Sequence, residues 1–300
     1  MSKNIFGIHV PTITPMNDRF EVDEKMLRQF NNFLIECGVC CLVPTANNGE
    51  LPNLNYEERK KVWKITVEVA FPTKTAVFPC ITANSTKDCV ELAQYAQSIG
   101  ADGIMVAPPF YFRLNNEEIC KHFLEIAGAI DIPIMIHNEP WIFKMDVTPD
   151  LMHSLNEDSG GKICLIKEST DNTQRVHEII RLCGEKVTVV VAGGGTALES
   201  LLLGAKAWMT GMINFIPATC VKLYDLAVKN GNYAEAKKVY YNKILPVHSM
   251  LQEIKKPVQT VKYALEVLWQ PVGPTRKPLY PLSESDKALV RKTIEEINKI

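Results

Sequence analysis

The sequence contains no long apolar run and carries almost no net charge. Its 33 lysine and arginine residues are balanced by 34 aspartate and glutamate residues, giving a formal net charge of −1. A membrane-spanning helix needs about 18 or more consecutive apolar residues, and binding to nucleic acid or an anionic membrane needs a basic surface. The opening residues MSKNIFGIHVPT also lack the apolar segment of a signal peptide. We therefore expect a cytoplasmic protein with neither nucleic acid nor a membrane as its partner.

Cysteine occurs nine times, but not in a pattern that indicates a metal site or disulfides. Cys37 and Cys40 form a C-x-x-C pair, yet no second such pair and no histidine pair completes a zinc site. An odd number of cysteines scattered among apolar neighbours is typical of reduced thiols, which behave as small apolar residues. A metal site is therefore not expected.

Short apolar runs rich in β-branched residues alternate with segments of helical periodicity. Most gaps between the runs are long enough for the crossover helix that joins two parallel strands. Eight runs of this kind occur, at residues 7–14, 40–46, 75–82, 103–109, 132–138, 163–169, 187–194 and 207–211. Several intervening segments start with the spacing of a helix N-cap, namely Asn55 with Glu58, Ser85 with Asp88 and Asn115 with Glu118.

Eight strand–helix units in about 225 residues predict a (β/α)8 TIM barrel, here assigned to residues 1–228. The alternative is a doubly wound open sheet, but the glycine-rich first turn G-x-G-x-x-G of that fold is missing. Three further amphipathic stretches follow, at 233–254, 257–269 and 283–299. They predict a C-terminal helical region over residues 229–300.

In a TIM barrel the active site is built at the carboxyl ends of the strands, and one of these ends carries a lysine. Lys167 closes the apolar run ICLI. An apolar pocket disfavours the ammonium form, so a lysine there can supply a free amine that attacks carbonyl groups and forms a Schiff base. The alternative is a side chain that extends to solvent or pairs with Glu168 or another carboxylate.

Other strand ends carry candidate groups of lower specificity. His137 closes the fifth run and is either a general acid and base or a structural histidine. Tyr111, in PPFYF, either moves protons or packs beside its phenylalanine neighbours. Gly193–Gly195 follow the seventh run and form either a tight turn that leaves room for substrate or a phosphate-binding loop.

Taken together, these segments resemble the dihydrodipicolinate synthase / N-acetylneuraminate lyase family of Schiff-base-forming barrels that handle pyruvate. The resemblance covers nearly the whole chain. It is carried by PTITPM near the start and by NNGELPNLNYEER, APPFYFRLNNEEI, IPIMIHNEP, IKEST and GPTRKPLYPLSE further along.

The resemblance implies a role for several residues. Lys167 matches the lysine that forms the imine, and Asn47 and Asn48 stand where the family binds the keto-acid carboxylate. Backbone groups from Met209 to Met212 line the pyruvate pocket. Tyr111 matches a tyrosine that reaches into the site of a neighbouring subunit, which implies a homotetramer or homodimer. No organic cofactor is implied.

Three positions depart from the family pattern. His137 stands where the family has a tyrosine that acts as acid and base, and Asn47 stands for a threonine of the proton relay. Ile142 lies near the place of an arginine that recognises the aldehyde substrate in the lysine-pathway synthase. The asparagine loop and the changed tyrosine are similar to 2-keto-3-deoxy-L-arabonate dehydratases and related sugar-acid enzymes.

The sequence therefore predicts a Schiff-base-forming lyase that acts on a 2-keto acid. Lys167 would form the imine, and His137 would carry protons. The reaction would be aldol cleavage or condensation with pyruvate, or dehydration of a 2-keto-3-deoxy sugar acid. Two alternatives remain open: a condensation of the dihydrodipicolinate synthase type, and a catalytically weak homologue that only binds keto acids.

Overall fold

All eight predicted strands are present and run parallel in a single sheet. The computed structural model describes residues 3–299. The strand order is β3-β2-β1-β8-β7-β6-β5-β4. The strands are β1 (Gly7–Val10), β2 (Cys41–Leu42), β3 (Ala76–Val77), β4 (Ile104–Val106), β5 (Ile134–Asn138), β6 (Ile163–Glu168), β7 (Thr188–Ala192) and β8 (Ala207–Met209).

The two edges of this sheet meet, which makes it a barrel. Beyond β3, Cys80 forms an isolated parallel bridge with Met105 of β4. The amide of Ile81 donates to the carbonyl of Met105 at 2.9 Å, so the chain continues the pairing past the end of β3. The predicted TIM barrel is confirmed, and the open-sheet alternative is wrong.

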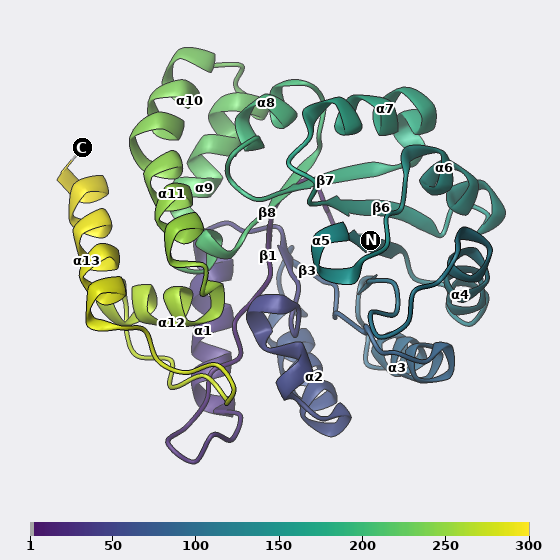
Figure 1. Cartoon of the computed structure of the whole chain (residues 1–300), viewed down its shortest axis with the longest axis horizontal. Helices are drawn as coiled ribbons and strands as arrows, with labels where there is room; N and C mark the ends of the chain where they lie inside the picture. The colour runs from purple at the N-terminus through teal and green to yellow at the C-terminus, as the bar shows by residue number, and fades with distance from the viewer. Residues whose placement is uncertain (1–2, 300) are drawn as a thin grey trace.

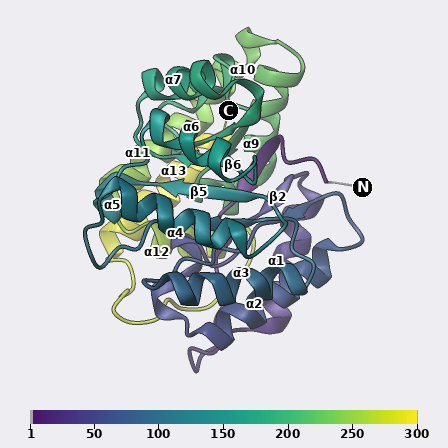
Figure 2. The same cartoon turned by 90° about the vertical axis from the view of Figure 1, so that its right-hand side faces the viewer.

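Helices surround the strands, as Figures 1 and 2 show from two directions. Asn55 and Asn115 form complete capping boxes with Glu58 and Glu118, as predicted. The Ser85 side chain caps the helix that begins at Thr86, also as predicted. The barrel helices are α1 (Glu24–Glu36), α2 (Tyr56–Ala70), α3 (Thr86–Ser98), α4 (Asn116–Gly128), α5 (Pro140–Phe143), α6 (Pro149–Asp158), α7 (Thr173–Cys183), α8 (Ala197–Leu202) and α9 (Pro217–Tyr224).

The three helical stretches predicted after the barrel are also present. A π-helical turn, Tyr240–Ile244, joins α10 (Tyr233–Val239) to α11 (Leu245–Ile254), so the first stretch is nearly continuous. It is followed by α12 (Pro257–Leu268) and α13 (Glu284–Lys299). In Figure 1, α11 and α13 run side by side at the edge of the molecule farthest from α4, with α12 at their lower end.

Alternation along the strands separates an inner core from an outer one. On β6 beyond the register irregularity that follows Ile163, Leu165 belongs to a buried cluster inside the barrel, whereas Ile166 packs outward against the helices. Because side chains two residues apart in a strand share a face, Lys167 points to the same side as Leu165. Met135 of β5 is likewise inside the barrel, and His137 follows it on that face.

Candidate active site

The register between β5 and β6 brings His137 and Lys167 together at the mouth of the barrel. His137 is the strand partner of Lys167, just as Met135 is the partner of Leu165 one layer deeper. Both side chains are almost fully buried, with 2% of His137 and 11% of Lys167 exposed. A core strand therefore ends on a lysine whose amine lies beside a histidine.

A carboxylate completes this pair. His137 Nε2 lies 2.6 Å from Lys167 Nζ and 2.7 Å from Glu139 Oε2. Lys167 Nζ donates to Glu139 Oε2 at 3.3 Å and to Ser169 Oγ at 3.2 Å. The alternative partner considered from the sequence, Glu168, is engaged elsewhere: it accepts from Asn138 Nδ2 at 3.0 Å and from the Thr170 amide at 2.9 Å.

The electrostatics of the cluster keep the histidine neutral and the glutamate ionised. Burial, reinforced by the charge of Lys167, lowers the pKa of His137 to about 4. Burial alone would raise the pKa of Glu139, but Lys167 and His137 together hold it well below its usual range. A neutral imidazole Nε2 carries at most one proton, so it cannot donate to Glu139 while accepting from Lys167. Nε2 therefore either donates to Glu139 or accepts from Lys167, but not both at once.

Glu139 has no counterpart among the residues predicted from the sequence. It follows β5 by one residue and directly precedes α5, with φ −143° and ψ 77°. This turn brings its side chain back over the strand end, where 15% of it is exposed. The available signal was a carboxylate two residues after a strand-end histidine, within the segment HNEP.

The loop after β2 supplies the other wall of the site. Asn47–Gly49 form a 3-10 turn, and Asn47 Nδ2 donates to Glu139 Oε2 at 3.2 Å. Asn48 is 8% exposed, and its Nδ2 has no hydrogen-bond partner among residues 3–299. A buried amide N–H without a partner is costly, so this group is suited to an anionic ligand. Asn47 is therefore bound to Glu139, whereas Asn48 keeps a buried amide N–H without a partner.

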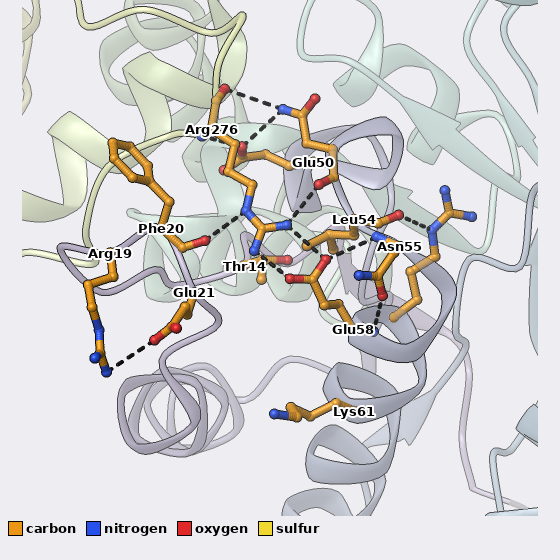
Figure 3. Close-up of polar contacts among 12 residues, drawn as sticks. Thr14, Arg19, Phe20, Glu21, Glu50, Leu54, Asn55, Glu58, Lys61 and Arg276 are labelled. Atoms are coloured by element: carbon orange, nitrogen blue, oxygen red, sulfur yellow. Dashed lines mark hydrogen bonds and ion pairs between the residues drawn. The ribbon is translucent and has the colours of Figure 1, made fainter.

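Glu50, which directly follows the asparagine loop, is bound by residues of the C-terminal region, and Figure 3 shows it near Arg276. Glu50 adopts the left-handed conformation, with φ 60°, and accepts from Lys262 Nζ of α12 at 2.8 Å and from the Arg276 amide at 2.8 Å. The Arg276 guanidinium in turn binds Glu58 and the carbonyl of Phe20. Residues from the C-terminal region therefore fix the loop that carries Asn47 and Asn48.

The asparagine loop, Glu50 and the cluster around Lys167 line one cavity of about 810 Å³ at the carboxyl end of the barrel. Its base holds Lys167, His137 and Glu139, and its outer wall holds His248 and Gln252 of α11. The remaining members that bear on function are Asn47, Asn48, Ser169, Trp141, Ile142, Met209, Thr210, Gly211 and Lys255.

Three predicted residues lie outside this cavity lining. Met212 is fully buried in the outer core. Gly193 has φ +77°, and its carbonyl accepts from Trp208 Nε1 at 2.6 Å. Tyr111 is 77% exposed and packs edge-on against Phe112. The carbonyls of Gly194 and Gly195 both accept from Tyr240 Oη, so the glycine loop is fixed by side chains behind it.

Between residues 3 and 299, no group of three or more histidine, cysteine, aspartate and glutamate side chains is arranged to hold a metal ion. Within the same range no helix is both long and apolar enough to cross a membrane. All nine cysteines are free thiols.

Comparison with known proteins identifies relatives along the full length. The model of the dihydrodipicolinate synthetase family matches residues 4–297. A 4-hydroxy-tetrahydrodipicolinate synthase of Methanocaldococcus jannaschii is 30% identical over 294 residues, which are 98% of this chain and 99% of that protein. A protein of the same name from Bartonella bacilliformis is 32% identical over 294 residues, 98% of each chain.

Solved structures show the same likeness in three dimensions. The crystal structure of a dihydrodipicolinate synthase is 30% identical, with a TM-score of 0.90 over 99% of this chain and 100% of that one. YagE from Escherichia coli K12, a prophage protein of the dihydrodipicolinic acid synthase family solved in complex with pyruvate, is 26% identical. It has a TM-score of 0.93 and covers 98% of this chain and 99% of its own.

Proposed function

The chain belongs to the dihydrodipicolinate synthetase family and is a lyase of the aldolase kind, and from this premise we propose that it forms a Schiff base with a 2-keto acid through Lys167. The observation that carries the proposal is the amine of Lys167, which lies in the cavity within hydrogen-bond reach of His137 and Glu139. Its nitrogen adds to the C2 carbonyl, and loss of water gives the imine.

The asparagine loop supports a keto acid as the substrate. Asn47 and Asn48 line the cavity together with Thr210 and Gly211, and the buried Nδ2 of Asn48 has no hydrogen-bond partner among residues 3–299. A carboxylate accepting this N–H would turn C2 toward Lys167, which favours addition by orientation. His137, neutral and 2.6 Å from the amine, would carry the protons that imine formation and hydrolysis require.

The far end of the cavity favours a hydroxylated tail over a second carboxylate. His248 and Gln252 offer neutral polar groups, and Glu139 places a negative charge beside the reacting carbons. We therefore favour a 2-keto-3-deoxy sugar acid, which would lose its C4 hydroxyl or undergo cleavage between C3 and C4. Condensation of the dihydrodipicolinate synthase type is the second candidate, favoured by the names of the relatives. The cavity is lined by Ile142 rather than by an arginine, which argues against this condensation.

Borohydride trapping tests the imine. Incubation with pyruvate and borohydride should leave a reduced adduct on the peptide that contains Lys167. The adduct should be lost in Lys167→Gln and kept in Lys255→Gln, since Lys255 also lines the cavity but lies just beyond the end of α11. Failure to trap any adduct on the wild type would disprove the imine. An adduct without turnover of any 2-keto-3-deoxy acid, scored for pyruvate release and dehydration, would indicate a keto-acid binder.

We also propose a homodimer or homotetramer, in which Tyr111 approaches a neighbouring site. Tyr111, Phe112, Trp141 and Ile142 are all exposed, with fractions from 48% to 77%. Exposed apolar patches of this kind mark interfaces. Phe112→Glu should lower the mass measured by sedimentation, whereas Phe71→Glu, at a residue 80% exposed after α2, should not. A wild type that sediments as a monomer would contradict the proposal.

A further inference from the structure

The two carboxylate oxygens of Glu139 have different surroundings. Oε2 accepts from Asn47 Nδ2 at 3.2 Å and from Lys167 Nζ at 3.3 Å, and it lies 2.7 Å from His137 Nε2. Oε1 has one contact, a long one of 3.4 Å from the exposed indole of Trp141. Oε2 is thus in contact with three polar groups, while Oε1 keeps free lone pairs in a residue that lines the cavity.

Oε1 is also close to where the substrate carbon next to the imine must lie. C3 of an imine is two bonds, or about 2.5 Å, from the lysine nitrogen. The carboxylate is anchored 3.3 Å from that nitrogen through Oε2. Its other oxygen can therefore reach a proton on C3 without displacing the side chains that hold Oε2.

Resting on the proposed imine, we propose that Glu139 is the catalytic residue that removes the proton from C3 and returns it. The C3–H bond breaks, the proton moves to Oε1, and the bonding pair forms C2=C3 while the C2=N pair returns to nitrogen. In a dehydration the nitrogen pair then restores C2=N, C3=C4 forms, and C4–O breaks. The leaving hydroxide takes a proton from the carboxylic acid and departs as water, which restores the carboxylate.

The charge balance of the cluster suits this exchange. The charge on Lys167 and the hydrogen bond from His137 outweigh burial and lower the pKa of Glu139, so the carboxylate is ionised and ready to accept. Loss of the C3 proton converts the cationic imine into a neutral enamine. The charge that stabilised the carboxylate disappears in the same step, so the carboxylic acid becomes more favourable as it forms.

His137 is less suited to act at C3. Its ring is 2% exposed and packs edge-on against Phe143, with the centroids 5.0 Å apart. Its Nε2 is already in contact with both Lys167 and Glu139. The imidazole is therefore placed to move protons between the amine and the carboxylate, while Glu139 faces the substrate.

Exchange of the pyruvate methyl protons in D₂O isolates this step, because it requires an imine and a base but no second substrate. Wild-type protein should deuterate the methyl group, as measured by proton NMR. Glu139→Gln should slow the exchange by about 100-fold or more, the usual contribution of a general base, while borohydride still traps Lys167. Glu117→Gln, which removes an exposed carboxylate from α4, should exchange like the wild type.

Chemical rescue separates a base from a positioning residue. Glu139→Ala should regain exchange in proportion to added formate, because formate can fill the space and accept the proton, whereas a purely structural role would not respond. Normal exchange in Glu139→Gln, or trapping lost in both variants while the wild type is trapped, would overturn the assignment to C3. Absence of trapping in the wild type would instead refute the imine itself.

Discussion

His137 Nε2 lies 2.6 Å from Lys167 Nζ because β5 and β6 pair in a register that sets the two residues opposite each other. Neither residue needs a loop to find the other, since both are anchored in buried strands. A sheet registers its side chains more rigidly than a loop does, and a rigid pair is what repeated proton transfer requires.

Replacing His137 by glutamine should slow imine formation without abolishing it. Glutamine keeps polar groups near Lys167 and Glu139 but cannot carry a proton, so adduct formation with pyruvate should fall by about 100-fold. The rate of borohydride trapping at fixed pyruvate measures this change. His177→Gln, on α7 and outside the cavity lining, serves as the control. Equal trapping rates for both variants would show that His137 moves no proton in this step.

Three buried histidines should make the protein less stable as the pH falls below about 6. Burial lowers the pKa of His9, His122 and His137 to about 4, whereas an unfolded histidine titrates near 6.5. Between about pH 4 and pH 6.5 the unfolded chain binds more protons than the folded protein does. The free energy of unfolding should therefore fall as the pH falls. The slope is about 1.4 kcal/mol per pH unit for each histidine.

Urea denaturation from pH 7 to pH 5 measures this slope. His122→Gln should remove one of the three contributions, because the side chain remains polar beside Thr86 Oγ1 but no longer titrates. His153→Gln on α6, which is only half-buried, should leave the slope as it is. A slope that is identical in wild type and His122→Gln would contradict the prediction.

Lys262→Met should destabilise the fold and loosen the asparagine loop. Lys262 is 5% exposed, and its loss would leave the fully buried Glu50 carboxylate without its cationic partner. Breaking a buried pair in this way costs about 3 to 5 kcal/mol. Arg28→Met breaks a half-exposed ion pair with Glu68 and should change stability by less than about 1 kcal/mol. Chemical denaturation of both variants tests the contrast, and similar values would disprove it.

Gly211→Ala should weaken keto-acid binding while leaving Lys167 in place. A Cβ atom on Gly211 would lie 2.5 Å from Asn48 Nδ2, so the amide must move away from its present position. Losing a hydrogen bond to a charged group costs about 1.5 to 3 kcal/mol, or roughly 10- to 100-fold in affinity. The pyruvate concentration that half-saturates borohydride trapping measures the loss. Gly128→Ala, where a Cβ meets nothing within 4 Å, is the control. An unchanged half-saturation would exclude Asn48 from carboxylate binding.

The barrel could be predicted from the sequence because its strands and helix starts are local patterns. The run ICLI before Lys167 and the capping pairs at Asn55 and Asn115 each lie within a few residues. The family followed from the same segments. The boundary near residue 228, between the barrel and the C-terminal helical region, stays a prediction. Lys262 and Arg276 lie beyond it but are bound to Glu50 in the loop after β2, so the two parts are in contact.

What the sequence did not indicate depends on backbone direction and distant pairing. Glu139 contacts His137 and Lys167 only because the chain turns back after β5, and its neighbours in the sequence do not signal that turn. The sequence predicted one shared role, carboxylate binding, for Asn47 and Asn48. It could not distinguish the two residues, because the partner of Asn47 is the Glu139 carboxylate, whose position depends on the same turn. No local pattern links Glu50 to a lysine that follows it by 212 residues.

That separation has a consequence for how the protein is made. Glu50 leaves the ribosome long before Lys262 and Arg276, since the N-terminal part of a chain emerges first. Until the last helices are synthesised, the nascent barrel carries a carboxylate without these two partners and an asparagine loop without its contacts to the C-terminal region. A prematurely terminated chain that ends before α12 therefore still contains Lys167, but its asparagine loop lacks the contacts with Lys262 and Arg276 that hold it in this structure.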